Sequence, residues 1–474
     1  MRLLTNEQIT KIHNRSLDML EKIGVKVFSE KAEVVFKANG CEIKNQRVHI
    51  PGTLMQDLLS HRQSDIILHS RSESTLNISK DGPFLHNGGY CADIIDIRNG
   101  ICRRATKKDA ADLVRLIDKL DNVDMIIMPV YPCDVDDRDS ILYSAKAMFE
   151  NTDKPAVSAG VRNLGELECL YRMYSVLAGG EEELRSKPMF EVGICPLSPM
   201  AIFEDDCDML MFAAEKGIPI SANAAPIAGL TAPITLLGSL TQQNAECLAV
   251  VALARLIDPV SKMIFATRLN CANLNTTTVY GGSPNSAIMS GCAAQLANYY
   301  GFVSNVYGLG ATSAVDSAQL GFEKSLRAIY PMIAGADVLS GCGTLADMSS
   351  ISYEMMAIDD EIFSMCKHFF GEVKDDEDDL GFEAVQNVIN GSSFILEENT
   401  LEYLRSSEIW NYNNSLSVNT NYASWSIDKK SILDNAEEKV RNILASHTPN
   451  PLSKEHSNEI NKIYMKWKKS REDS

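Results

Sequence analysis

Basic side chains are scarce relative to acidic ones in this 474-residue sequence. It contains 45 Lys and Arg against 63 Asp and Glu, which gives a formal net charge of −18 at pH 7. Binding to a phosphate backbone or to an anionic membrane surface depends on clustered basic side chains. The charge balance therefore argues against nucleic acid or a membrane as the main partner, and it mildly favours a cationic ligand.

Long apolar runs are also missing. No stretch reaches the roughly 20 apolar residues that span a bilayer. The N-terminal segment, residues 1–16, is polar and helix-like, and it lacks the apolar core of a signal peptide. We therefore expect a cytoplasmic protein.

Motifs that bind metals or supply nucleophiles are absent as well. The 12 cysteines include no C-x-x-C pair and most lie in apolar segments, which favours reduced, partly buried thiols. A zinc site is the weaker alternative, because no His/Cys cluster has ligand spacing. The sequence contains no P-loop, no H-E-x-x-H and no Ser-His-Asp order. We expect no metal in this chain.

The sequence does contain a regular alternation of short apolar runs and amphipathic helices. The predicted strands are Phe84–Gly89, Met125–Tyr131, Ala156–Gly160, Phe190–Cys195, Ile218–Asn223, Met263–Arg268, Phe302–Tyr307 and Val338–Cys342. The predicted helices begin near Thr106, Asp137, Asn163, Glu204, Ala232, Pro284, Asp316 and Glu354. Such alternation gives parallel strands, and about eight units favour a closed α/β TIM (β/α)₈ barrel. An open doubly wound sheet is the alternative, although no G-x-G-x-x-G follows the first strand.

Two additions flank the predicted barrel, which spans residues 81–371. Residues 1–80 resemble a small α+β cap that begins with an amphipathic helix from Thr5 to Ile23, with Thr5 as its N-cap. Residues 372–474 are predicted to form a helical C-terminal extension that packs against the barrel or a neighbouring subunit. An acidic run at 374–379 is interpreted as solvated chain.

The active site of such a barrel lies at the carboxyl ends of its strands. These ends are rich in Asn, Tyr and Gly, which suits binding and orientation of a ligand better than hydrolysis. Tyrosine rings hold quaternary ammonium groups by cation–π attraction. A lyase or aldolase is a rival interpretation, but the strand ends offer no Schiff-base lysine and no paired metal-binding carboxylates.

Five motifs follow one another along the chain: Gly100–Asp124, Thr231–Ile257 with its QQNAE stretch, Tyr280–Gly301, Ser304–Leu326 and Ile333–Gly343. In this order they resemble those of the trimethylamine:corrinoid methyltransferase family. The resemblance extends from about residue 5 to 371. It implies a barrel that holds a methyl group of an amine in line with the Co(I) of a corrinoid. The corrinoid is carried by a separate protein, so no cofactor is expected in this chain, and Co(I) itself is the nucleophile.

The sequence has no pyrrolysine, a residue that the trimethylamine-using archaeal members of this family carry. The resemblance therefore implies the branch that uses quaternary amines, such as glycine betaine, proline betaine, carnitine or γ-butyrobetaine. The tertiary amine leaves such a substrate without receiving a proton, so no general acid is required. Arg268 is placed to bind a betaine carboxylate bidentately. The alternatives are a methyltransferase for a tertiary methylamine and a non-catalytic barrel that binds an amine or a corrinoid protein.

Site roles follow from strand-end position and from the resemblance. The catalytic candidates are Glu246 and His86, and the substrate-binding candidates are Tyr131, Asn223, Gln243, Arg268, Asn305 and Tyr307. The residues expected to face an approaching corrin ring are Gly281, Gly282, Gly308, Gly310 and Asp316, of which Asp316 is also a predicted helix cap. The expected partners are a small methylated amine, a cognate corrinoid protein and a second copy of this chain.

Overall fold

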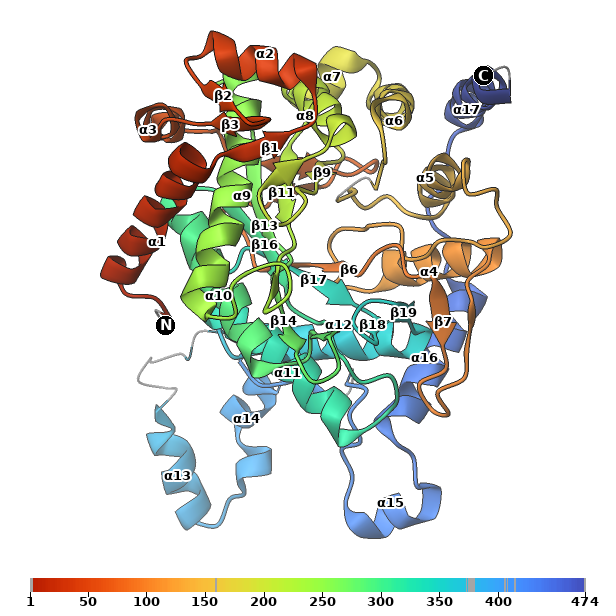
Figure 1. Ribbon diagram of the computed structural model, residues 1–474. Coiled ribbons are helices and arrows are strands. Elements are labelled where there is room, and N and C mark those ends of the chain that lie inside the picture. The colour runs from red at the N-terminus through yellow and green to blue at the C-terminus, as the bar shows by residue number, and fades with distance from the viewer. Residues whose placement is uncertain are drawn as a thin grey trace.

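A curled parallel sheet forms the centre of the molecule in the computed structural model (Figure 1). The structure describes residues 3–157, 160–371, 373, 380–404, 406, 408–412 and 415–472. The acidic run at 374–379 and residues 158–159 of the third predicted strand lie outside this described part.

Six of the predicted strands form this sheet, in the order β6-β17-β16-β13-β11-β9. Their bounds are β6 (Phe84–Asn87), β9 (Val192–Ile194), β11 (Ile220–Ala224), β13 (Met263–Thr267), β16 (Val303–Tyr307) and β17 (Val338–Cys342). Every pairing between neighbours is parallel. All residues of β11, β13 and β17 are buried, as expected for a parallel sheet covered on both faces.

The prediction of a regular second and third strand is corrected, because the described residues of these segments form only isolated bridges. Met125 pairs with His86, Ile126 with Ala156, and Ala156 with Phe190, all in parallel orientation. These bridges lie between the two ends of the sheet, from β6 to the residues before β9. Prolines at 129, 132 and 155 supply no backbone N–H, so a regular ladder cannot continue through these segments.

The helices between the strands begin close to the predicted residues. They are α4 (Lys107–Lys119), α5 (Ser140–Asn151), α6 (Leu164–Ala178), α8 (Glu204–Lys216), α9 (Leu236–Ile257), α10 (Pro284–Tyr300), α11 (Ala318–Ile333) and α12 (Tyr353–His368). A further short helix, α7 (Glu181–Ser186), follows α6. Thr106 forms the predicted cap of α4 in a capping box with Asp109, which supplies hydrogen-bond partners for the first turn.

The N-terminal cap joins the main body through strand pairing. Its sheet has the order β10-β1-β3-β2. Its elements are α1 (Asn6–Asp18), a π-helical turn (Met19–Ile23), β1 (Val25–Val27), α2 (Glu30–Ala38), β2 (Glu42–Lys44), β3 (Arg47–His49) and α3 (Gly52–Ser60), with β10 (Ala201–Ile202) from the main body. Thr5 caps α1 as predicted, in a capping box with Gln8. A hairpin of β4 (Ile67–His69) and β5 (Thr75–Asn77) leads to β6.

Small sheets follow the carboxyl ends of the central strands. A three-stranded sheet contains β12 (Ile227–Ala228), β14 (Asn270–Asn273) and β15 (Thr278–Tyr280). A four-stranded sheet contains β7 (Asp93–Ile95), β8 (Cys102–Arg104), β18 (Thr344–Leu345) and β19 (Ser350–Ile351). Because each begins shortly after a central strand ends, they form a rim at the edge where the chemistry was predicted.

The described part of the C-terminal segment is helical. It contains α13 (Phe382–Ile389), a 3₁₀ turn (Phe394–Leu396), α14 (Glu398–Tyr403), α15 (Tyr422–Asp428), α16 (Ile432–Ser446) and α17 (Lys454–Glu472). Helix α16 packs on α12 and α4, and α17 packs on α6, so both helices contact the main body. Helices α13 and α14 project from the main body (Figure 1). Within the described residues, no helix has the length and apolarity needed to cross a membrane.

Candidate active site

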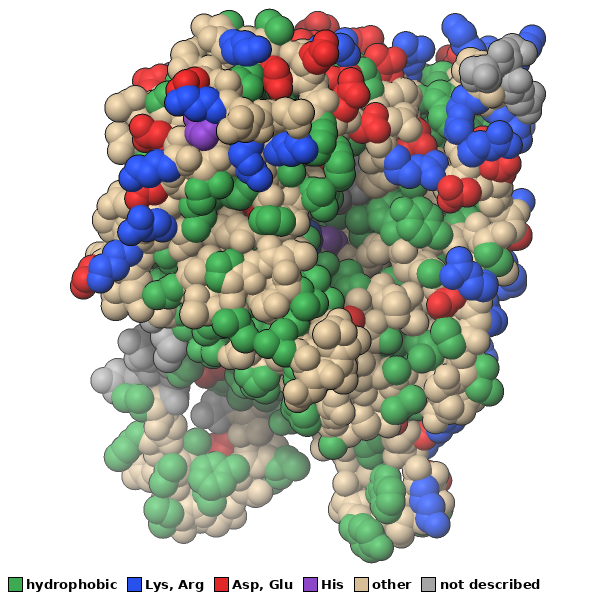
Figure 2. Space-filling model, viewed as in Figure 1, with side chains coloured by type: hydrophobic (Ala, Val, Ile, Leu, Met, Phe, Trp, Pro, Cys, Tyr) green, Lys and Arg blue, Asp and Glu red, His purple; other side chains and the backbone are tan. Residues whose placement is uncertain are grey.

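A cavity of about 180 Å³ lies at the carboxyl edge of the central sheet. Its lining residues follow β11, β13, β16 and β17: Ala225, Ile227, Arg268, Asn270, Val279, Gly281, Tyr307, Gly310, Ala311, Arg327, Asp347 and Met348. Four of the predicted site residues, Arg268, Tyr307, Gly281 and Gly310, therefore meet in one place. The face drawn in Figure 2 is hollowed near its centre, and hydrophobic side chains border the hollow.

His86, Asn305 and Arg268 form one hydrogen-bonded chain. His86 Nδ1 donates to the carbonyl of Asn87 at 2.7 Å, which leaves Nε2 to accept from Asn305 Nδ2 at 3.2 Å. The Asn305 Oδ1 atom then accepts from Arg268 Nη1 and Nη2, each at 3.1 Å. Sequence reasoning selected all three residues, and this arrangement fixes the Arg268 guanidinium at the end of β13.

His86 is neutral near physiological pH. Burial and, to a smaller extent, the positive charge of Arg268 lower its pKa from 6.5 to about 3. A histidine in this state accepts a hydrogen bond but carries no proton to donate from Nε2. The geometry therefore suits His86 to positioning Asn305 rather than to proton transfer.

The ring of Tyr307 contacts two guanidinium groups. The Cζ atoms of Arg268 and Arg327 lie 5.1 and 5.8 Å from its centroid, within cation–π range. Tyr307 was predicted to face a cationic substrate, but the cations found against its ring are these arginines. Tyr131, the other predicted aromatic, packs against Tyr90 with ring centroids 4.9 Å apart and does not line the cavity.

Arg327 is a site residue that sequence reasoning missed. It projects from α11 and is only 1% exposed. Its Nη1 atom donates to the carbonyl of Gly281 and, at 3.4 Å, to Asn270 Oδ1, while its Nε has no partner among the described residues. Burial lowers its pKa to about 10, so it remains cationic at neutral pH. Strand-end position could not reveal it, because a helix carries it.

Neither cavity arginine forms an ion pair with a described residue, although the charge of Glu191 raises the pKa of Arg268 and those of Asp347 and Glu323 raise the pKa of Arg327. Among the ion pairs formed by the described residues, none includes Arg268 or Arg327. Burial also lowers the pKa of Arg268, which reflects the cost of holding its charge away from water. Two adjacent cations, one buried and one half-buried, that form no ion pair are unusual, since charges withdrawn from water are normally paired.

Asp347 also lines the cavity and was missed. Its Oδ1 atom accepts hydrogen bonds from the Gly281 N–H and from Thr312 Oγ1, both at 2.8 Å. Burial raises the pKa of this carboxyl group, and these two hydrogen bonds oppose that effect. Asp347 comes after β18, in the connection to β19, so the strand-end rule did not select it.

Close contacts within the chain explain why glycine occupies most of the positions predicted to face a corrin ring. A Cβ at Gly281 would lie 2.7 Å from Asp347 Oδ1, and one at Gly282 would overlap the carboxylate of Glu323. A Cβ at Gly308 would overlap Leu339, whereas Gly310 faces Arg327 Nη2 at 3.8 Å. These close approaches explain three of the four glycines without a corrin ring, whose contact with them stays a prediction.

Glu246 and Gln243 lie on α9, away from the cavity lining. Glu246 accepts hydrogen bonds from Ser198 Oγ at 2.8 Å and from the Met200 N–H at 3.0 Å, so it anchors the loop between β9 and β10. Burial raises its pKa. Gln243 is buried and donates to Cys247 Sγ at 3.1 Å. The structure does not bring either side chain to Arg268, and their predicted roles have no geometric support.

Two further predicted residues stand apart from the cavity. Asn223 is buried in β11 and hydrogen bonds the thiol of Cys195. Asp316 is exposed and is not the cap of α11, which is a correction. Ser317 caps that helix by accepting from the Leu320 N–H, because its extended backbone places the hydroxyl over the first turn.

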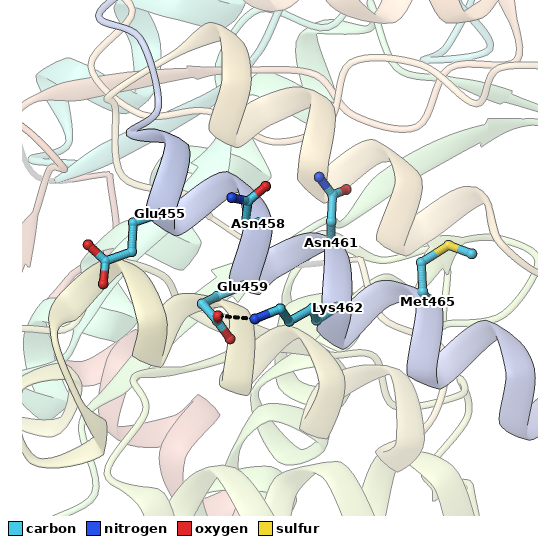
Figure 3. A pocket seen from close by; sticks show the side chains of 6 residues that line it. All are labelled: Glu455, Asn458, Glu459, Asn461, Lys462 and Met465. Atoms are coloured by element: carbon cyan, nitrogen blue, oxygen red, sulfur yellow. Dashed lines mark hydrogen bonds and ion pairs between the residues drawn. The ribbon is translucent and has the colours of Figure 1, made fainter.

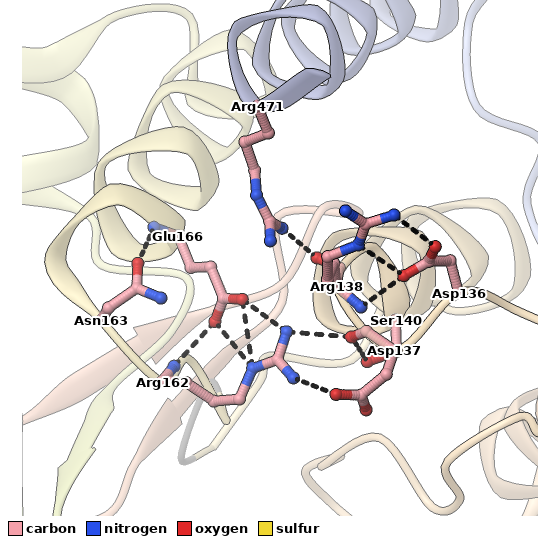
Figure 4. A network of polar contacts seen from close by, with 8 residues as sticks. All are labelled: Asp136, Asp137, Arg138, Ser140, Arg162, Asn163, Glu166 and Arg471. Atoms are coloured by element: carbon pink, nitrogen blue, oxygen red, sulfur yellow. Dashed lines mark hydrogen bonds and ion pairs between the residues drawn. The ribbon is translucent and has the colours of Figure 1, made fainter. Parts of the chain in front are cut away.

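Polar contacts elsewhere have structural roles. Arg162 binds Glu166 at 2.7 Å and Asp137 at 3.3 Å, and Arg471 of α17 donates to the carbonyl of Arg138 (Figure 4). This network ties the loop before α5 to α6 and to the C-terminal helix.

A larger depression of about 430 Å³ is lined by α17 alone, through Glu455, Asn458, Glu459, Asn461, Lys462 and Met465 (Figure 3). These side chains project from one exposed helix and do not converge on a common point. Within the described residues, no group of three or more His, Cys, Asp or Glu is arranged to hold a metal ion.

A parallel α/β sheet with a small charged cavity at its carboxyl edge is the architecture of an enzyme that acts on a small molecule. Residues 1–472 match the family described as trimethylamine methyltransferase (MTTB), and the chain belongs to this family. The predicted resemblance is thereby confirmed, and so is the prediction of an amine methyltransferase.

Curated relatives match over nearly the whole chain. A trimethylamine methyltransferase MttB of Desulfitobacterium hafniense is 28% identical over 452 residues, covering 94% of this chain and 90% of its own. The trimethylamine methyltransferase MttB of Methanosarcina thermophila is 29% identical over 468 residues, covering 95% and 94%. A glycine betaine methyltransferase of Desulfitobacterium hafniense is 28% identical over 457 residues, covering 96% and 94%.

A solved structure supports the fold. The crystal structure of the hydroxylamine MtmB complex covers 93% of this chain and 89% of its own, with a TM-score of 0.53 and 11% sequence identity. At this identity the similarity concerns the course of the chain and not the chemistry of the site.

Proposed function

We propose that this enzyme transfers a methyl group from a quaternary amine that bears a carboxylate, a betaine, to the Co(I) of a separate corrinoid protein. One observation carries the choice of substrate: Arg268 and Arg327 line the same cavity, are cationic, and form no ion pair with a described residue. A bound carboxylate would supply the missing negative charge.

The energetics favour an anionic group in the cavity. A charge that is withdrawn from water and left unpaired costs several kcal/mol, and a hydrogen-bonded counter-charge offsets much of that cost. The Arg268 guanidinium is held by Asn305 and cannot turn away to find another partner. The volume of about 180 Å³ also favours a small ligand, since sites for drug-sized molecules are typically about 300–1,000 Å³.

In this proposal the chain binds, orients and shields the substrate. The carboxylate lies between Arg268 and Arg327, and the cationic nitrogen points away from them. When docked, the corrinoid of the partner protein supplies the nucleophile that takes the methyl group. No side chain of this protein has to donate a proton, because the tertiary amine leaves as a neutral molecule. The neutral state of His86 is compatible with that requirement.

The comparisons support two alternative substrates, a betaine and a tertiary methylamine. A relative named glycine betaine methyltransferase supports the betaine, while relatives named trimethylamine methyltransferases support a tertiary methylamine. Trimethylamine has no carboxylate, so it would leave both arginines unpaired. The cavity charges therefore favour the betaine.

The architecture and assembly are part of the same proposal. We infer that the bridges between β6 and β9 complete an eight-stranded barrel over residues 81–371, flanked by the cap at 1–80 and the extension at 372–474. We further propose that the enzyme works in the cytoplasm and associates with a second copy of itself through α13. Phe382 and Ile389 on that helix are 76% and 79% exposed, which is a high exposure for apolar side chains. Light scattering of the Phe382→Ser/Ile389→Ser variant should show a lower molar mass than wild type.

A direct assay tests the proposed reaction. The enzyme is mixed with a reduced corrinoid protein and, separately, with glycine betaine, carnitine, γ-butyrobetaine, choline and trimethylamine, and the visible absorbance is followed. Loss of the Co(I) band is expected with a carboxylate-bearing amine only. Turnover with trimethylamine alone would favour the alternative substrate, and no turnover with any amine would favour a non-catalytic binding barrel.

A further inference from the structure

Three consecutive non-glycine residues adopt left-handed backbone conformations beside the cavity. The φ angles of Ala346, Asp347 and Met348 are 48°, 53° and 72°. Residues with side chains rarely take this conformation, and a run of three costs free energy that the surrounding structure must offset. Backbone strain of this kind is concentrated at ligand-binding and catalytic sites.

The turn is held from two sides. The N–H of Asp347 donates to the carbonyl of Ala311 at 2.9 Å, and that of Ala346 donates to Ser313 at 3.2 Å. Before the turn, Lys324 Nζ donates to the carbonyl of Thr344 at 2.6 Å. As a result, both Asp347 and Met348 are fixed in the cavity lining.

The two oxygens of Asp347 have different surroundings. Both of its hydrogen bonds, from Gly281 and Thr312, fall on Oδ1. Its Oδ2 atom has no hydrogen-bond partner among the described residues, and no ion pair there includes this carboxylate. The cavity therefore presents one carboxylate and two guanidiniums, none of which forms an ion pair among the described residues, although Asp347 and Arg327 attract each other through space.

We propose that Asp347 selects the cationic nitrogen of the substrate and, with Arg268 and Arg327, makes the cavity a site for a zwitterion. The proposal rests on the proposed function, because it assigns the second charge of the same ligand. A dipolar ligand would bind in one orientation, with its carboxylate at the arginines and its ammonium group at Asp347.

The chemistry of a quaternary ammonium makes a carboxylate the appropriate partner. Such a nitrogen has no N–H, so hydrogen-bond acceptors cannot recognise it, and attraction must come from a negative charge or from aromatic faces. The Tyr307 ring already contacts two arginines, which leaves Asp347 as the negative charge among the lining residues. A rival explanation is that Asp347 only compensates the charge of Arg327 through space.

A pair of ligands separates these explanations. Glycine betaine and 3,3-dimethylbutanoate share their shape and carboxylate, but the second has carbon in place of the charged nitrogen. Titration calorimetry would measure both dissociation constants for the wild type and for Asp347→Asn. The amide keeps the shape of the carboxylate, and Asn tolerates the left-handed conformation well, so the variant should fold.

For the Asp347→Asn variant, we expect glycine betaine to bind at least about tenfold more weakly, which corresponds to about 1.4 kcal/mol. Binding of 3,3-dimethylbutanoate should stay equal or become tighter, because a negative charge near its carboxylate is removed. Asp337→Asn is the matched control. Asp337 is another partly desolvated carboxylate, which accepts from the Ser304 N–H and Oγ and does not line the cavity, so its variant should leave the ratio of the two constants unchanged.

Equal changes for both ligands would overturn the assignment of Asp347, since they would show that it acts through Arg327 or through the fold. Unchanged glycine betaine binding would overturn it as well. Both results leave the proposed function intact, provided that the wild type binds betaine. A wild type that binds neither ligand, yet binds trimethylamine, would overturn the proposed function and this inference together.

Discussion

Arg268 and Arg327 approach the same ring, with their Cζ atoms 5.1 and 5.8 Å from the centroid of Tyr307. One arginine comes from the end of a central strand and the other from a helix that follows the next strand. Like charges repel, so their shared position is costly unless an anion lies near them.

Removal of Arg327 should weaken carboxylate binding selectively. A hydrogen bond to a charged group is worth about 1.5–3 kcal/mol, so Arg327→Met should raise the dissociation constant for glycine betaine by roughly 10- to 150-fold. Choline, which lacks a carboxylate, should bind the variant and the wild type similarly. Calorimetric titration with both ligands checks this, and an equal loss for choline would remove Arg327 from the carboxylate site.

A carboxylate introduced into the protein beside Arg268 should compete with the ligand carboxylate and weaken ligand binding. Asn305→Asp has nearly the same shape but places a carboxylate 3.1 Å from both terminal nitrogens of Arg268, where it would form an ion pair. We expect glycine betaine affinity to fall by about tenfold or more, while tetramethylammonium binds at least as well as before. Betaine binding that survives unchanged would contradict the role of Arg268.

The pKa of His86 predicts how stability depends on pH. Its folded-state pKa, about 3, lies below its ordinary value of 6.5, so the unfolded chain binds the proton more readily. The stabilisation is complete above about pH 6.5 and is lost as the pH falls toward 3. Denaturant unfolding of wild type and His86→Gln between pH 7 and 4 should show a steeper loss for wild type. Parallel curves would show that His86 does not titrate in this way.

The buried ion pair of Lys324 and Asp359 stabilises the chain just before the left-handed turn at residues 346–348. Both side chains are fully buried with their charged atoms 2.7 Å apart. Lys324→Met would leave Asp359 without its cation, and we expect a loss of about 3–5 kcal/mol in the free energy of unfolding. The double variant Lys324→Met/Asp359→Leu should recover much of it. A single variant as stable as wild type would show that the pair contributes little.

The alternation of strand and helix could be predicted from the sequence because it depends on local patterns. Apolar runs such as Met263–Arg268 and caps such as Thr106 carry their own structural signal, and the structure confirms both with small shifts at the ends. The strand predicted at Met125–Tyr131 failed because prolines remove the N–H groups that a ladder requires. Its bridges depend on neighbours far away in the chain.

The sequence by itself determined the parallel order of the elements, the edge at which the cavity lies, and residues such as Arg268 and Tyr307 that directly end a strand and line it. Only the tertiary structure decided that Arg327 and Asp347 join them, since a helix and a turn that follow later elements carry these side chains to the cavity. It also decided that Glu246 anchors a loop. The physical reason is that side-chain direction along a strand follows from a two-residue period, whereas the meeting of charges from separate elements depends on how those elements pack.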